Sequence, residues 1–156
     1  MDTQSLDDDI RIRHHWFGVE CNNEAWRLAE LKTRTTDECD SMLNNAHAAA
    51  YHWSIVGTED NKAKAWALLA QAHALAGNGP IAVRYAAKSF EYVTANNSPD
   101  WEIAFAHLIM ANAACASGDG SKHALYYTSA QELGNAIIDS DDKGIFMKSF
   151  ANVPRP

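Results

Sequence analysis

Apolar side chains recur every three or four residues along most of the chain, in segments that end at glycine, proline or asparagine. The clearest segment begins at Thr35, three residues before Glu38, which is the spacing of a helical capping box. Its apolar positions follow helical periodicity as far as Gly57, at Cys39, Met42, Leu43, Ala46, Trp53 and Val56. Because the other segments show similar periodicity and none carries a strand signal, we predict an all-α protein.

The predicted helices are joined by short turns, so that neighbours in the sequence pair as hairpins. The three hairpins and a terminal helix are expected at about 9–56, 60–95, 99–138 and 143–151. Residues 1–8 are polar and acidic, and we expect them to be flexible. The whole chain, 1–156, then forms one helical domain whose terminal helix caps the last exposed face of the array.

The second and third hairpins are similar when Gly77 and Gly118 are taken as equivalent helix ends. The residues at matching offsets are Trp66, Leu69 and Ala70 before the first glycine and His107, Met110 and Ala111 before the second. This pattern resembles the tetratricopeptide repeat, which has Trp, Leu-Gly/Ala and Gly at fixed positions of a helix–turn–helix unit. The resemblance implies a short α-solenoid, with glycines 41 residues apart where the usual repeat has about 34.

A narrower resemblance rests on three short motifs, Ala46-His47-Ala48, Tyr51-His52-Trp53 and Val56-Gly57-Thr58. With them the chain is similar to a family of uncharacterised bacterial proteins of the tetratricopeptide-like type. This resemblance implies an all-α bacterial protein, and it implies no reaction.

The charge balance narrows the classes of partner. The chain carries 13 Lys and Arg against 20 Asp and Glu, a formal charge of −7 at pH 7. This argues against coating nucleic acid or an anionic membrane, since both need a positive field. No apolar run approaches the roughly 18 residues of a membrane span, and the acidic first residues do not have the form of a secretion signal. Three widely spaced cysteines fit a reducing compartment, so we expect a cytoplasmic protein.

The sequence carries no motif of a catalytic or cofactor site. Histidine pairs such as HxxxH or HExxH are missing, so no single helix supplies two metal ligands at that spacing. There is no serine nucleophile elbow, and Cys115 lies in an alanine-rich run where a buried thiol would be inert. We therefore expect a protein without enzymatic activity and without a cofactor.

In the tetratricopeptide repeat the first helix of each unit lines the inner face, and that resemblance implies a partner-binding surface here. Its residues are Lys64, Gln71, Phe105, Leu108 and Asn112. This surface is mostly apolar with one cation, which suits an extended or helical apolar peptide that is neutral or basic. Gln71 and Asn112 would hydrogen-bond to the main chain of the peptide. Self-association through an exposed terminal hairpin would give a homodimer.

A second interpretation is a small-molecule or metal site between the first two hairpins. Its residues are His47, Tyr51, His52 and Trp53. Single histidines on neighbouring helices, such as His73 or His107, could complete a metal site. The simpler interpretation of each histidine is a half-buried ring that fills space and forms one hydrogen bond.

Overall fold

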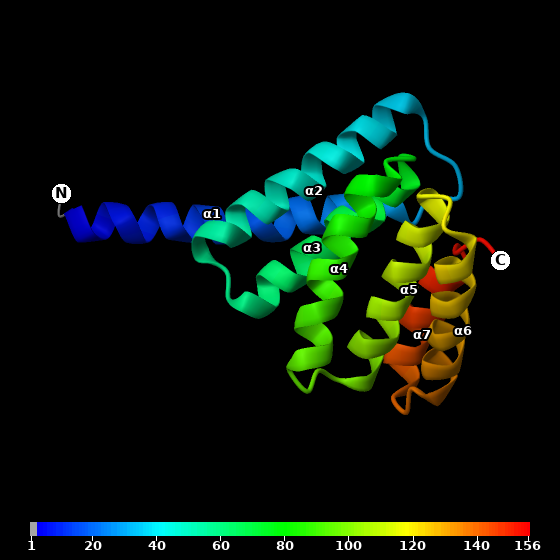
Figure 1. The fold of residues 1–156 in the computed structure, drawn as a ribbon. Coiled ribbons are helices and arrows are strands. Elements are labelled where there is room, and N and C mark those ends of the chain that lie inside the picture. The colour runs from blue at the N-terminus through cyan, green and yellow to red at the C-terminus, as the bar shows by residue number, and fades with distance from the viewer. Residues whose placement is uncertain (1–2) are drawn as a thin grey trace.

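Residues 3–156, which a computed structural model describes, form seven α-helices and contain no strand (Figure 1). Side chains are described from Asp7 onward. The helices are α1 (Thr3–Ala29), α2 (Thr36–Val56), α3 (Glu59–Leu75), α4 (Gly79–Ala95), α5 (Asp100–Ala116), α6 (Gly120–Ala136) and α7 (Ser140–Phe150). Neighbouring helices pack as the pairs α1–α2, α3–α4 and α5–α6, and α7 lies against α5 and α6. Within this described part, no helix combines the length and apolar character needed to cross a membrane.

Helix α1 begins earlier than the polar composition predicts. Residues 3–8 are helical where we expected a flexible segment, and residues 1 and 2 lie outside the described part of the chain. The helix passes unbroken through Gly18, which lies against α2: an added Cβ would come within 3.0 Å of the Trp53 indole. Once α1 is anchored in this way, each further turn costs little, because elongating a helix is easier than nucleating one.

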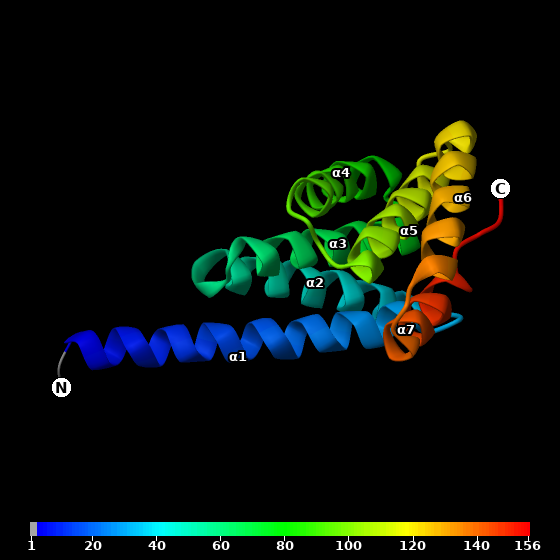
Figure 2. The ribbon, with the colours of Figure 1, turned by 90° about the horizontal axis from the view of Figure 1, so that it is seen from below.

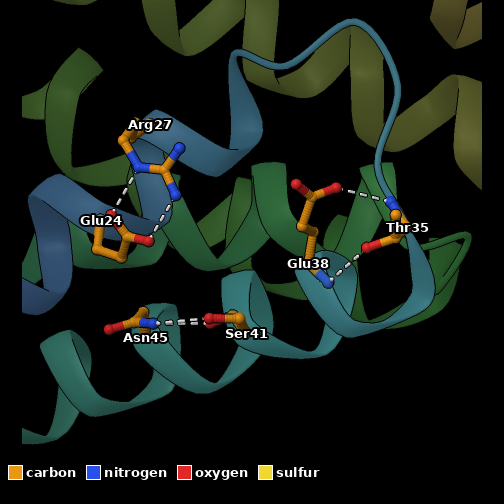
Figure 3. A network of polar contacts seen from close by, with 6 residues as sticks. All are labelled: Glu24, Arg27, Thr35, Glu38, Ser41 and Asn45. Atoms are coloured by element: carbon orange, nitrogen blue, oxygen red, sulfur yellow. Dashed lines mark hydrogen bonds and ion pairs between the residues drawn. The ribbon is translucent and has the colours of Figure 1, made fainter.

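The start of α2 is held by the capping box that the sequence predicts (Figure 3). The Thr35 hydroxyl accepts a hydrogen bond from the Glu38 amide at 3.2 Å, and the Thr35 amide donates to the Glu38 carboxylate at 2.8 Å. On the neighbouring end of α1, Arg27 donates two hydrogen bonds of 2.7 Å to Glu24. The two reciprocal bonds between Thr35 and Glu38 satisfy amides that the first turn of a helix leaves unpaired.

The pairs α3–α4 and α5–α6 repeat each other helix for helix. Each of these four helices has 17 residues, and the separation between Gly77 and Gly118 also separates the corresponding helix bounds. Both glycines have a positive φ, of +78° and +77°, which an L-residue adopts only with strain. The two hairpins therefore match in helix length and in the conformation of the glycine at the turn.

The terminal helix α7 lies against α5 and α6, as Figure 1 shows. It begins at Ser140, three residues before the expected start, because the Asp139 carboxylate caps it by accepting from the amides of Asp141 and Asp142. Phe146 is 1% exposed and lies directly over Gly134 of α6. Beyond α7, His123 Nε2 lies 2.8 Å from the carbonyl oxygen of Pro154, which ties the C-terminal residues to α6.

The N-terminal part of α1 projects past the rest of the molecule, as two views agree (Figures 1 and 2). The contacts of α1 with α2 include His14 and Phe17, which both lie against His52. Residues 7–13 are all exposed. Helix α1 therefore has a packed C-terminal part and an unpaired N-terminal arm.

Candidate functional site

A pocket of about 320 Å³ opens where the first helices of the three pairs meet α7. Its walls come from the C-terminal half of α1, the N-terminal halves of α3 and α5, the second half of α4, and α7. Helix α3 packs against both α1 and α5, so the three first helices stand in a row behind the pocket. Its volume is at the lower end of the range for ligand pockets, enough for a large side chain or a small ring system.

Three aromatic rings form the apolar wall of this pocket. The rings of Trp26 and Phe105 meet edge to face with centroids 5.6 Å apart, and Trp101 stands beside them on α5. Ala67 of α3 lines the pocket between larger neighbours, and its small side chain leaves the space open. Ile145 of α7 lies at the rim with 61% of its surface exposed. Half-buried aromatic rings with one open face are typical of surfaces that hold an apolar group.

Carboxylates and ammonium groups alternate around the pocket. Lys64 Nζ lies 2.8 Å from Asp60 and 3.0 Å from Glu102, and it stands 6.0 Å from the centre of the Trp101 ring. Burial opposes the charge on Lys64, but the two carboxylates outweigh that effect and raise the pKa of its ammonium group. Lys64 is therefore held as a cation rather than as a nucleophilic amine.

On the opposite side of the pocket, Glu30 accepts a hydrogen bond of 2.6 Å from Lys148. Three carboxylates thus meet two ammonium groups around the opening, which leaves an excess of negative charge there. The sign of this excess agrees with the net charge of the chain, so the site attracts neutral or cationic groups more readily than anionic ones.

Of the five residues that we expected on the inner face, two line the pocket and three are buried. Lys64 and Phe105 line the pocket, whereas Gln71 and Asn112 are 4% and 5% exposed and Leu108 is fully buried. Asn112 Nδ2 donates to Gln71 Oε1 at 2.8 Å, so each amide meets the other instead of the main chain of a partner. The reason is that α5 packs directly on α3 at this height, and the inner face is closed there.

The four residues of the alternative site do not come together either. His52 and Tyr51 contact His14 of α1, with Nδ1 of His14 and His52 2.8 Å apart. Trp53 is 8% exposed and belongs to the core, where His15 meets its ring edge to face. His47 points toward another helix. The expected cluster is therefore split between two histidine pairs on different faces of α2.

The second pair joins α2 to α3. His47 Nε2 lies 2.9 Å from His73 Nε2, and Asn78 Nδ2 lies 3.2 Å from His73 Nδ1. With Asn78 as the donor, His73 carries its proton on Nε2 and donates it to His47, an arrangement that requires a neutral His73 ring. Burial, followed by the neighbouring His47 and Arg84, lowers the pKa of His73 below its ordinary 6.5.

Neither histidine pair has the geometry of a metal site. The ring centres are 5.0 Å apart for His14 and His52 and 5.1 Å apart for His47 and His73. Each of these distances is close to the distance between the two facing nitrogens plus the radii of the two rings. Each nitrogen therefore faces its neighbour directly, as in an N–H···N hydrogen bond, and the lone pairs do not converge on a third point. Among the described residues, no group of three His, Cys, Asp or Glu side chains is placed to hold a metal ion.

Sequence reasoning missed several residues of the pocket. Trp26 and Trp101 carry an apolar pattern that reads equally well as core, and both lie partly buried at the edge of the core. Ile145 and Ser149 reach the pocket only because α7 folds back over the first helices. For Trp101 the sequence did contain a signal of partial exposure. This residue follows Pro99 and Asp100 in the first turn of a helix, where only a short part of the helix face can be buried.

No family model matches the chain, and neither the curated proteins nor the solved structures gave a match. The assignment of a function therefore rests on the residues and the geometry of this chain.

Proposed function

We propose that the chain is a non-catalytic binding module of the tetratricopeptide-like type, which holds a peptide segment of a protein partner in the pocket of α1, α3, α5 and α7. The observation that carries this proposal is the pocket itself: about 320 Å³, walled by Trp26, Trp101 and Phe105. Aromatic walls with an open face are where protein interfaces concentrate their binding energy.

The partner segment is neutral or basic and presents one large apolar side chain. That side chain fills the space above Ala67, and flanking Lys or Arg residues meet the carboxylates of Asp60, Glu102 and Glu30. The paired helices support this proposal, since stacked helix pairs with their first helices in a row give a continuous inner wall. The affinity is modest, because the pocket accommodates one anchor residue and not a long segment.

The proposal is tested by selecting peptides from a displayed random library on the wild-type protein. We expect the selected peptides to share one Leu, Phe or Trp next to Lys or Arg. Ala67→Phe should abolish their binding, because the new ring occupies the space of the anchor residue. An acidic consensus, or peptides that bind equally to Ala67→Phe when circular dichroism shows that variant folded, contradicts the proposal.

A further inference from the structure

The aromatic rings of the pocket are oriented in more than one direction. The planes of Trp26 and Phe105 are inclined by 69°, so the two rings form a corner instead of a flat wall. Trp101 turns the face of its ring toward a cation, since Lys64 Nζ stands over it at 6.0 Å. The face of an aromatic ring carries partial negative charge, whereas an aliphatic wall does not. The pocket is therefore suited to a cation as well as to an apolar group.

The charges around the pocket favour the entry of one further cation. Asp60 and Glu102 both pair with Lys64, at 2.8 and 3.0 Å, so this group of three carries a net negative charge. Glu30 and Lys148 pair at 2.6 Å and balance each other. One monovalent cation in the pocket compensates the excess, whereas a ligand with its own carboxylate would leave it uncompensated.

The walls of the pocket favour a cation without N–H groups. A primary ammonium ion is strongly hydrated, and on leaving water it needs hydrogen-bond acceptors in return. The ring walls supply none, and each carboxylate at the opening is already paired with a lysine of the chain. A quaternary ammonium ion has no N–H group to satisfy, and its methyl groups pack on aromatic faces. A volume of about 320 Å³ accommodates one ion of the size of choline.

We propose that this pocket binds a small quaternary ammonium compound that carries no carboxylate. Its positive nitrogen lies among the rings of Trp26, Trp101 and Phe105. The ligand fills the space above Ala67, so it competes with the peptide anchor of the proposed function. It does not depend on that function, because an apolar anchor residue needs no cation inside the pocket.

Calorimetric titration with ligands of similar size tests this assignment. Choline is the quaternary ion, neohexyl alcohol is its uncharged analogue with carbon in place of nitrogen, and glycine betaine carries a carboxylate. We expect choline to bind at least about 10-fold more tightly than either of the others, because it alone combines attraction to the rings with the required charge. Absence of choline binding up to about 10 mM overturns the proposal and leaves the peptide proposal standing. Equal binding of the uncharged alcohol or of betaine also overturns it.

Two variants locate the ligand in the pocket. Trp101→Leu should weaken choline binding about 10-fold, because it removes one ring face. Its matched control is Trp16→Leu, since Trp16 is 56% exposed on α1 outside the pocket. Asp60→Asn removes the excess negative charge from the first turn of α3 and should also weaken binding. Its matched control is Asp141→Asn, in the exposed first turn of α7.

Both controls should bind choline as the wild type does. Unchanged binding in whichever of Trp101→Leu and Asp60→Asn circular dichroism shows to be folded overturns the proposal. Equal weakening in a variant and its control overturns it as well.

Discussion

The hydrogen bond between Gln71 and Asn112 joins equivalent positions of the two repeated helix pairs, 41 residues apart. Both side chains are nearly fully buried, so removal of one leaves the other without a partner. Asn112→Ala should therefore cost about 1–3 kcal/mol in the free energy of unfolding, measured by urea denaturation. The double variant Gln71→Leu/Asn112→Leu should lose less than the sum of the two single changes to Leu. Additive losses would mean that the two amides do not depend on each other.

Gly134 is the residue on which α7 docks. A Cβ at this position would overlap the Phe146 ring, whereas a Cβ at Gly144 on α7 meets nothing. We expect Gly134→Ala to destabilise the protein by about 1–3 kcal/mol through overpacking. Gly144→Ala is the matched control and should raise stability by up to about 1 kcal/mol, as alanine does in an exposed helix. Equal thermal shifts for the two variants would contradict the docking of Phe146.

At the scale of single residues, the sequence was informative about backbone roles and less so about exposure. The stops at Gly77 and Gly118 and the Thr35 capping box could be predicted, because they depend on a few neighbouring residues. The burial of Asn112 could not, because it depends on how closely α5 approaches α3, which is a property of the packed array.

The helices α1, α2 and α3 are tied by two histidine pairs, which makes their packing dependent on pH. Burial and the nearby His14 lower the pKa of His52, and burial followed by His47 and Arg84 lowers that of His73. In the unfolded chain both rings titrate near 6.5, so below that pH the unfolded state binds more protons than the folded state does. The stability from neutral histidines is therefore complete above pH 6.5 and is lost as the pH falls through the lower folded pKa values.

We accordingly expect the urea midpoint to decrease between about pH 7.5 and about pH 5.5, above the range in which most carboxylates titrate. His73→Gln should flatten this dependence, because the amide can still donate to His47 and does not titrate. A midpoint that rises on acidification, or an unchanged slope in His73→Gln, would contradict the assignment of neutral histidines.

At the scale of elements, helix existence followed from periodicity, and helix pairing followed from the short turns. The first turns of α1 could not be predicted in this way. Their polar composition predicts a frayed segment, unless it is known that they continue a helix that is anchored further along the chain. The neighbours of the histidines on α2 could not be predicted at this scale either. His47 and His52 are close in sequence, yet they face different neighbouring helices, α3 and α1.

At the scale of the whole molecule, the pocket is made by parts that lie far apart in the chain, from Asn22 to Ser149. Lys64 and Phe105 line it, and the resemblance to the tetratricopeptide repeat had led us to expect both on the inner face. The contribution of α7 could not, since only the folded array shows that its exposed Ile145 stands at the rim.

The matched pair Ile145→Lys and Leu125→Lys tests the pocket most directly. The two parent side chains are 61% and 62% exposed, but Ile145 lies at the rim of the pocket and Leu125 lies on α6 outside it. A basic peptide selected on the wild type should be titrated calorimetrically into both variants and into His52→Ala. We predict that Ile145→Lys weakens binding by about 30-fold or more, because it removes an apolar contact and repels the peptide. Leu125→Lys and His52→Ala should bind as the wild type does. Unchanged binding to Ile145→Lys together with loss in His52→Ala would contradict the account and move the site to the histidines of α1 and α2.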